Sequence, residues 1–155
     1  MPKILAIDDK QDNLTIISDL LKSIIPDCFV ITAQSGTEGI EKARTELPDT
    51  ILLDLIMPEM DGFEVCERLK DDEKTKQIPV VMLTGIIIDA KSRVKGLELG
   101  ADAFLSKPIE GMELAAQVKV MLRIKKAEDQ LRKEKDLLER QVEKRTVELI
   151  KKMTS

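Results

Sequence analysis

Histidine, tryptophan and tyrosine are absent from these 155 residues, and cysteine occurs twice. Without histidine, these residues cannot form a Ser-His-Asp or Cys-His nucleophile system, and they cannot bind zinc through imidazole. They also cannot donate a phosphoryl group from a histidine side chain. Any chemistry in this chain must therefore use carboxylates, lysines, hydroxyl groups and the backbone.

The two cysteines, Cys28 and Cys66, do not form a closely spaced pair. Cys28 falls in an expected strand and Cys66 on an expected helix, and free cysteine behaves as a small apolar residue that is often buried. We therefore expect two buried thiols, not a disulfide or a metal site.

Long hydrophobic runs are also lacking. The longest apolar stretch covers residues 78–88 and is interrupted by Pro79, Thr84 and Gly85. It is far shorter than the ~20 residues that a membrane helix needs. The chain runs from Met1 directly into an apolar strand pattern, without the features of a secretory leader. We therefore expect a cytoplasmic protein with no membrane contact.

Charge and helix-breaking residues both change along the chain. Residues 1–122 contain 14 Lys and Arg against 22 Asp and Glu, a net charge of −8, whereas residues 123–155 contain 11 against 7, a net charge of +4. The last proline is Pro108 and the last glycine is Gly111. We expect a folded domain over residues 1–122 and an extended helix over residues 123–155.

Strand and helix patterns alternate five times in the first region. Short apolar strands are expected at residues 3–8, 28–33, 50–54, 78–84 and 101–106. Apolar residues at helical spacing lie between them, and the pairs Ser35 with Glu38 and Asp61 with Glu64 have the spacing of helix-capping boxes. This regular alternation predicts an α/β fold, a doubly wound parallel sheet with helices on both faces.

Polar residues gather where these strands end. They are Asp8 and Asp9, Asp54, Thr84, and the run Ser106-Lys107-Pro108. Ligands of such sheets lie beyond the carboxyl ends of the strands, so these side chains are expected to share one edge. Mg²⁺ would relieve the repulsion among the carboxylates. One carboxylate could then accept a phosphoryl group, whose oxygens a lysine and a hydroxyl would stabilise.

Residues 1–122 resemble the receiver domain of two-component response regulators. The resemblance rests, in this order and spacing, on Asp8-Asp9, Asp54 in "LLDLIMPEMDG", Thr84-Gly85 and Lys107-Pro108. It implies a flavodoxin-like sheet of five strands in the order 2-1-3-4-5. It also implies Mg²⁺-dependent phosphoryl transfer from a phosphohistidine of a partner kinase or phosphotransfer protein. We therefore expect a phosphorelay module, not a metabolic enzyme.

The resemblance further implies a role for each acidic residue and for one apolar neighbour. Asp54 would be the phosphoacceptor and would also contact the metal. Asp9 would bind Mg²⁺ directly, and Asp8 would bind it directly or through water. Ile56 would contribute its backbone carbonyl to the metal.

The same resemblance implies how the added phosphoryl group is held. Lys107 would pair with it or, before phosphorylation, with Asp54. Thr84 would hydrogen-bond to a phosphoryl oxygen. The Lys107–Pro108 peptide bond is cis in the family, which would aim the lysine.

Two further features concern the switch and its lifetime. The resemblance implies that movement of Thr84 lets Phe104 turn inward, which would change the surface of the fourth helix, fifth strand and fifth helix. Phe104 lacks the hydroxyl of the tyrosine that is commoner at this position. Ile56 and Ile86 flank the acceptor site with apolar side chains. We expect them to hinder an attacking water, so that the phosphorylated state is lost slowly.

Alternative functions of these residues are limited. A haloacid-dehalogenase-like phosphatase also forms an aspartyl phosphate but needs an acid two residues after the nucleophile, where this chain has Ile56. A Gly-rich phosphate loop of the P-loop type is missing. The remaining alternative is a dimerisation scaffold with the receiver fold that works without phosphorylation. The phosphorelay module and the scaffold differ in whether dimerisation or helix exposure responds to phosphate at Asp54.

The C-terminal region predicts one long helix. Continuous helix from Ile109 to Lys152 would measure ~65 Å, about twice the diameter of a small domain, so we expect part of it to project and to need a partner. A heptad pattern places Met121, Glu128, Lys135, Val142 and Leu149 at a, and Ile124, Leu131, Leu138, Arg145 and Lys152 at d. This seam favours a weak parallel dimer. The alternative is a solvated single helix with i,i+4 ion pairs.

Residues 134–155 also resemble the signalling helices that join receivers to a downstream kinase, sensory or cyclase domain. We therefore expect an output domain beyond these residues, with a stand-alone receiver and dimerising tail as the alternative. A homodimer could use the face of the fourth helix, fifth strand and fifth helix, the tail, or both. Interspersed acids and the lack of aromatics disfavour direct nucleic-acid binding.

Overall fold

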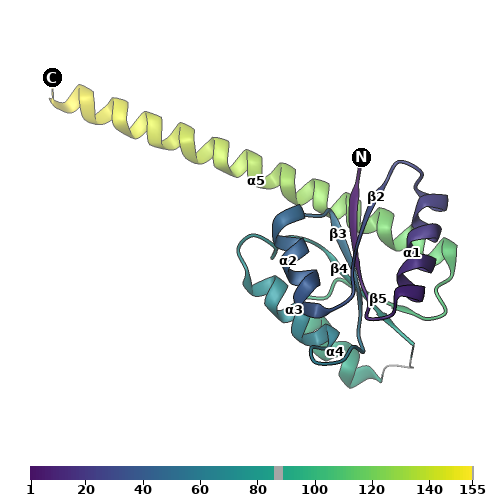
Figure 1. The fold of residues 1–155 in the computed structure, drawn as a ribbon. Coiled ribbons are helices and arrows are strands. Elements are labelled where there is room, and N and C mark those ends of the chain that lie inside the picture. Colours follow the sequence, from purple (N-terminus) through teal and green to yellow (C-terminus); the bar gives the residue numbers. More distant parts are fainter. Residues whose placement is uncertain (86–88, 155) are drawn as a thin grey trace. The chain divides into compact units, whose positions relative to one another are not determined.

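A computed structural model describes residues 1–85 and 89–154 (Figure 1). The strands are β1 (Lys3–Ile7), β2 (Phe29–Ala33), β3 (Thr50–Asp54), β4 (Val80–Thr84) and β5 (Ala103–Ser106). The helices are α1 (Gln11–Ile24), α2 (Gly36–Glu46), α3 (Gly62–Asp71), α4 (Ala90–Glu98) and α5 (Gly111–Thr154). The strands are all parallel in the order β2-β1-β3-β4-β5, which confirms the predicted fold.

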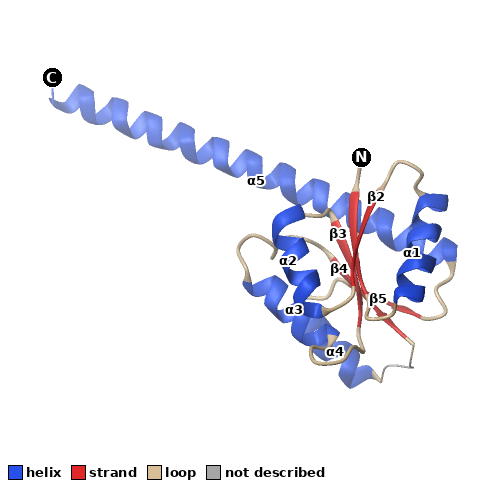
Figure 2. Ribbon diagram, viewed as in Figure 1, coloured by secondary structure: helices blue, strands red, loops and turns tan. Residues whose placement is uncertain are grey.

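Helices cover both faces of this sheet (Figure 2). One core lies under α2 and α3 and includes Ala43, Val65 and Leu69, and the other lies under α1 and the first turns of α5. Strands β3 and β4 are buried along their whole length, and their sequences are almost continuously apolar. Burial on both faces is the physical reason for such sequences, because neither face can carry solvated side chains.

Helix caps fix several of the element boundaries. The Ser35 hydroxyl accepts a hydrogen bond from the Glu38 backbone N–H, and the Asp61 carboxylate accepts one from the Glu64 N–H, as the sequence predicted. A third cap, Asp89 at the start of α4, was not predicted. These side chains satisfy backbone donors that a helix start leaves without a partner.

Two strands begin two residues later than the sequence suggested, and β2 begins one residue later, at Phe29. Strand β4 starts at Val80, because Pro79 has no N–H for the sheet ladder. Strand β5 starts at Ala103, and the preceding Asp102 uses its carboxylate to accept the Val80 N–H at 2.8 Å. The later starts of β4 and β5 come from the hydrogen bonding of the backbone, which cannot be predicted from a pattern of apolar residues.

The chain divides into two compact units, residues 1–125 and residues 126–155. In the first unit, Leu114, Val118 and Met121 of α5 are buried in the core, and Met121 is 3% exposed. Met121 therefore does not belong to a dimer seam, where the heptad pattern had placed it. No helix in the described part of the chain combines the length and apolar character that a membrane crossing requires.

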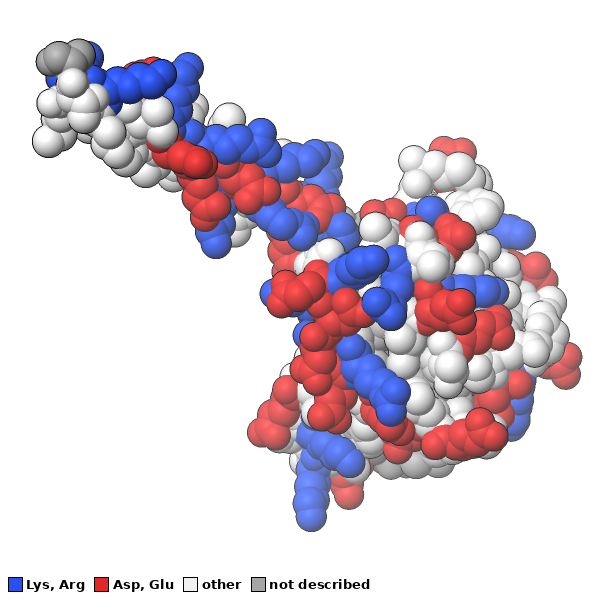
Figure 3. All heavy atoms as spheres, turned by 60° about the vertical axis from the view of Figure 1, so that its left-hand side comes forward, with Lys and Arg blue, Asp and Glu red and all other residues white. Residues whose placement is uncertain are grey.

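The second unit is helical through Thr154. Its apolar side chains are exposed, including Leu131 at 67% and Leu138 at 61%. Figure 3 shows basic and acidic side chains interleaved along this helix, with uncharged surface between them.

Candidate functional site

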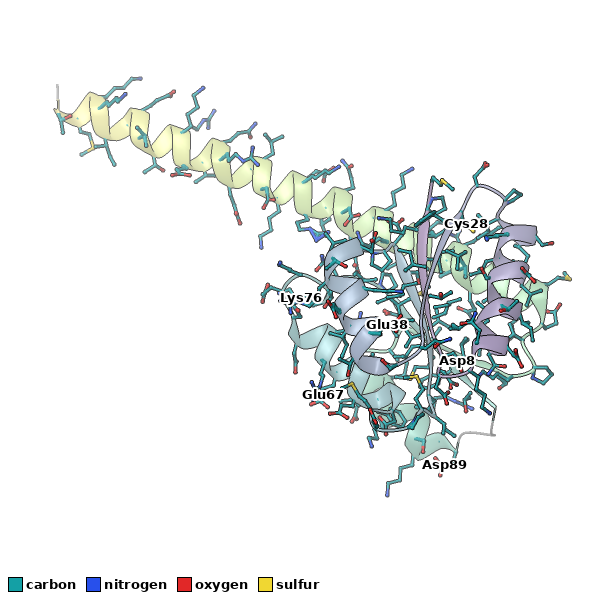
Figure 4. All side chains as sticks on the ribbon, in the orientation of Figure 1. Asp8, Cys28, Glu38, Glu67, Lys76 and Asp89 are labelled. Atoms are coloured by element: carbon teal, nitrogen blue, oxygen red, sulfur yellow. The ribbon has the colours of Figure 1, made fainter. Side chains whose placement is uncertain are left out.

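The candidate site lies where the parallel strands end. Asp8 directly follows β1, Asp54 and Thr84 are the last residues of β3 and β4, and Lys107 directly follows β5. Parallel strands bring these four positions to one edge, as expected for the fold. Figure 4 shows Asp8 near this edge, with Cys28 near the opposite one.

Three carboxylates converge at this edge. Asp8, Asp9 and Asp54 each offer an oxygen, and these oxygens all lie within 4.8 Å of one another. Asp8 is 1% exposed and Asp54 is 6% exposed, so two of the three are largely removed from water. Buried acids this close repel one another unless cations offset their charge. Carboxylate oxygens are ligands that suit Mg²⁺, so the donor set fits this metal.

Lys107 supplies one such positive charge. Its Nζ donates to Asp54 Oδ1 at 3.0 Å and to Asp8 Oδ2 at 3.0 Å. Burial by itself lowers the pKa of Lys107, but the hydrogen bonds to Asp54 and Asp8 outweigh burial, and the pKa lies above its ordinary value. The lysine therefore stays charged. The sequence suggested its contact with Asp54 but not the one with Asp8.

The backbone holds Lys107 in place. Its N–H donates to the carbonyl of Thr84 at 2.7 Å, which links the ends of β4 and β5. The peptide bond between Lys107 and Pro108 is cis. The Thr84 side chain belongs to the same edge and is 3% exposed. Lysine and threonine are thus positioned by neighbouring strands.

Asp54 has a raised pKa, chiefly because burial disfavours its charged form. The hydrogen bond from Lys107 lowers the pKa, whereas the negative charges of Asp8 and Asp9 raise it. The net direction means that Lys107 does not fully offset burial and the neighbouring acids. A divalent cation would supply the missing positive charge and favour the ionised, nucleophilic form of Asp54.

An open cleft of about 390 Å³ gives access to Asp54. Its lining residues are Asp9, Lys10, Asn13, Asp54, Ile56, Met57, Pro58, Gly85 and Lys107. Ile56 is 58% exposed, so it presents an apolar surface at the cleft. Ile86, the second expected apolar neighbour, lies outside the described residues. Lys10 and Asn13 were not predicted from the sequence, because their positions at the start of α1 carry no motif.

Gly62 is a further residue that the site requires. A Cβ at this position would lie 2.7 Å from the Asp54 carbonyl oxygen and 2.8 Å from the Leu55 Cα. The Gly62 N–H also donates to the Leu55 carbonyl at 2.7 Å. Glycine therefore lets the start of α3 approach the end of the strand that carries Asp54. The glycine after Asp61 in the quoted motif was the available signal.

Phe104, the expected switch residue, lies on β5 against the core under α2 and α3. Its ring also meets α4, since a Cβ on Gly96 would be 2.3 Å from Phe104 Cζ. Gly96 thus leaves the space that the ring occupies. The contact couples β5 to α4 through one aromatic side chain.

Comparison with known proteins agrees with this geometry. Residues 4–119 match the family model described as the response regulator receiver domain. Response regulator PleD of Caulobacter vibrioides is 43% identical over 131 residues, which cover 84% of this chain and 28% of PleD. The alkaline phosphatase synthesis regulator PhoP of Bacillus subtilis is 41% identical over 121 residues, 78% of this chain and 48% of PhoP. The chain thus spans less than half the length of these two relatives.

Solved structures give the same result. Chemotaxis protein CheY4 of Vibrio cholerae has a TM-score of 0.73 and 30% identity, covering 79% of this chain and 99% of that one. The receiver domain of sensor histidine kinase PA1611 from Pseudomonas aeruginosa, solved with magnesium in its active site cleft, has a TM-score of 0.68 and 25% identity, covering 80% of this chain and 97% of that one. The chain belongs to the family of response regulator receiver domains, proteins of two-component signal transduction.

Proposed function

We propose that this domain is the phosphoacceptor of a two-component phosphorelay and that Asp54 carries the phosphoryl group. The carrying observation is that Asp54 lies at an open cleft, 3.0 Å from the Lys107 ammonium and within 4.8 Å of two further carboxylates. The 155 residues contain no histidine, so a phosphohistidine donor comes from another protein or another part of a longer chain. The domain is a relay component and not a metabolic enzyme.

The transfer uses the side chains of this cleft. A carboxylate oxygen of Asp54 attacks phosphorus while the P–N bond of the donor phosphohistidine breaks. The electron pair leaves with the imidazole nitrogen, which takes up a proton from solvent, and an acyl phosphate remains on Asp54. Lys107 and the Thr84 hydroxyl then hold the phosphoryl oxygens.

The metal proposed for this site is Mg²⁺. Asp8, Asp9, Asp54 and the backbone carbonyl of Ile56 would hold it. When bound, it would neutralise charge on the acidic cluster and on the phosphoryl oxygens. The apolar side chain of Ile56 would restrict an attacking water, which would make loss of the phosphoryl group slow. Ile56→Asn should therefore shorten the phosphorylated lifetime.

The donor protein is proposed to dock on α1 beside the cleft. A second, more apolar hollow of about 210 Å³ is lined by Asn13, Ile16, Ile17, Lys107, Pro108 and Ile109. It shares Asn13 and Lys107 with the acidic cleft, and Ile16 is 57% exposed. An apolar surface continuous with the acceptor site fits a kinase or phosphotransfer protein that must bring its phosphohistidine to Asp54.

Phosphorylation is proposed to act through self-association. Phe104 links the site strands to α4. A change at α4 would then alter the formation of a homodimer. The homodimer would use α4, β5 and α5, the C-terminal helix, or both. The proposed setting is the cytoplasm, with no direct contact to nucleic acid. Phosphorylation-independent scaffolding is the second candidate function.

Intact mass after incubation with acetyl phosphate and Mg²⁺ tests the acceptor. We expect one phosphoryl adduct on the wild-type chain, its removal by hydroxylamine, and no adduct on Asp54→Asn. Circular dichroism would verify that both proteins are folded. A folded wild type that takes up no phosphoryl group would favour the scaffold.

A further inference from the structure

The C-terminal helix carries more exposed apolar surface than a solvated helix needs. Beyond Lys125, the exposed large apolar side chains are Leu131, Leu137, Leu138, Val142, Val147, Leu149, Ile150 and Met153. Neither core cluster contains a described residue beyond Ile124. Such a surface on a charged helix indicates an interaction site.

Six apolar residues of this segment repeat with a period of 11. Ala127, Leu138 and Leu149 are spaced by 11 residues, and so are Leu131, Val142 and Met153, which each lie four residues further on. An 11-residue repeat corresponds to ~3.67 residues per turn, close to that of a straight α-helix. These six residues therefore share one face of α5, and the charged residues Glu134, Lys135 and Arg145 lie at its margins. We call this face the seam.

The seam replaces the heptad pattern for this part of the chain. Within residues 126–154, the heptad includes the charged residues Glu128, Lys135, Arg145 and Lys152. Its Met121 is buried in the receiver core, and Ile124 packs against the same core. Half of its remaining eight positions are thus charged, whereas all six seam positions are apolar. Burial of unpaired charge between helices is costly, so the 11-residue pattern is the better interface.

The charges beside the seam fit a second copy of the same segment. Glu134 and Lys135 are neighbours on opposite flanks of the seam. In a parallel pair that is in register, the flank of one helix that carries Glu134 faces the flank of the other helix that carries Lys135. The dimer therefore contains two equivalent Glu134–Lys135 pairs, one on each side of the seam. Each seam residue then meets its own counterpart. The paired length from Ala127 to Met153 is ~39 Å.

We propose that residues 126–154 form a parallel, in-register, two-stranded coil with a second copy through the seam, with the slight right-handed supercoil of an 11-residue repeat. The proposal rests on the homodimer of the proposed function and names its contact residues. It also assigns α5 two separate roles. Its first turns complete the receiver core, and its remaining turns pair with the second copy.

Cysteine cross-linking of the full 155-residue chain separates this seam from the heptad. We expect Ala127→Cys and Met153→Cys to form disulfide-linked dimers at least ~5-fold faster than Glu128→Cys and Lys152→Cys, since the first pair faces the partner. Cys28 and Cys66 are buried and should not compete. Burial raises the pKa of Cys66 to about 11, which suppresses its reactive thiolate. If Glu128→Cys and Lys152→Cys formed disulfide-linked dimers faster, the heptad would describe the interface and the proposal would be overturned.

Matched aspartate variants test the same face by sedimentation. Val142 lies on the seam, whereas Val147 lies on the opposite side of the helix, and both are exposed, at 60% and 47%. We expect Val142→Asp to raise the dimer Kd at least ~30-fold and Val147→Asp to change it less than ~3-fold. Leu138→Asp and Leu137→Asp form a second pair with the same expectation. Equal effects within both pairs would refute the seam.

Each protein is measured with and without acetyl phosphate and Mg²⁺, and intact mass records the phosphoryl adduct separately. A seam variant that is fully phosphorylated but monomeric supports the proposal. A wild type that carries the adduct yet stays monomeric in both conditions overturns the second copy as partner while leaving the phosphoacceptor intact. A wild type without the adduct instead counts against the proposed function, and its cross-links still decide the seam.

Discussion

At the scale of single residues, the site is a balance of charge in which Lys107 opposes three carboxylates. The lysine contacts Asp8 and Asp54 at 3.0 Å, yet the pKa of Asp54 remains raised because burial and the neighbouring acids outweigh the hydrogen bond. The folded domain without metal therefore contains unfavourable negative charge. Stability and metal binding are opposed demands on the same residues.

Asp54→Asn should therefore stabilise the metal-free domain. Removal of the charge relieves burial and repulsion, while Lys107 keeps its contact with Asp8. Screening at the open cleft limits the expected gain in the free energy of unfolding to about 0.5–1 kcal/mol. Urea unfolding in EDTA measures it. Mg²⁺ should raise the wild-type midpoint more than that of the variant. A less stable variant in EDTA would show that the Lys107–Asp54 pair outweighs the repulsion.

The residues of the site were largely predictable because their signals are local. Asp8, Asp9, Asp54, Thr84 and Lys107 each follow or end an apolar strand, and parallel strands must bring their ends together. The contact of Lys107 with Asp8 was not predictable, because 99 residues separate them and side-chain reach decides it. The cleft residues Lys10 and Asn13 were not predictable because no motif marks their positions at the start of α1.

At the scale of elements, strand patterns and caps predicted the order of the fold, whereas hydrogen bonds set its boundaries. The strand signal was clear because β3 and β4 are buried on both faces. The seven-residue period assigned to α5 failed at Met121, because one helix serves two surfaces. The buried residues in the first turns of α5 and the exposed seam residues lie on different faces of the helix. A single periodicity therefore cannot describe both sets.

The contact between α4 and β5 yields a prediction about Gly96. In an exposed helix, Gly→Ala stabilises by ~1 kcal/mol. Here the new Cβ would lie 2.3 Å from Phe104 Cζ, so Gly96→Ala should destabilise by about 1–2 kcal/mol as the ring is displaced. In a Phe104→Leu background the same substitution should cost much less. A double-mutant cycle by urea unfolding measures this coupling. Additive effects would mean that the ring moves freely and transmits nothing to α4.

The apolar hollow beside α1 yields a prediction about donor specificity. The donor for this test is a phosphotransfer domain that phosphorylates the wild type. Ile16→Asp should slow phosphoryl transfer from it at least ~10-fold, because a charge would enter the docking surface. Phosphorylation by acetyl phosphate should be unchanged, since that small donor needs only the cleft. Phe29→Asp is the control, because Phe29 is similarly exposed, at 51%, but lies on β2. Equal slowing by both substitutions would place the donor elsewhere.

At the scale of the whole molecule, the two units divide the work. Receiver chemistry needs the five strands, their loops and the first turns of α5, because the described core residues end at Ile124. The charge difference along the sequence reflects the same division, with the net negative charge in the region that carries the acidic site. Association, by contrast, is assigned to residues 126–154.

This division predicts the behaviour of a chain that ends after Lys125. Residues 1–125 form a compact unit with both apolar cores, so their free energy of unfolding should stay within about 0.5 kcal/mol of that of the full chain. Uptake of a phosphoryl group from acetyl phosphate should be unchanged, because every side chain of the acidic cleft is retained. Urea unfolding and intact mass measure these two quantities, and Asp54→Asn in the same shortened chain is the control for the adduct.

Dimerisation of the shortened chain should weaken at least ~30-fold, as measured by sedimentation, if the seam forms the dimer interface. A shortened chain that still dimerises as strongly as the full one would assign association to α4, β5 and the first turns of α5, and would reduce the seam to a solvated helix face.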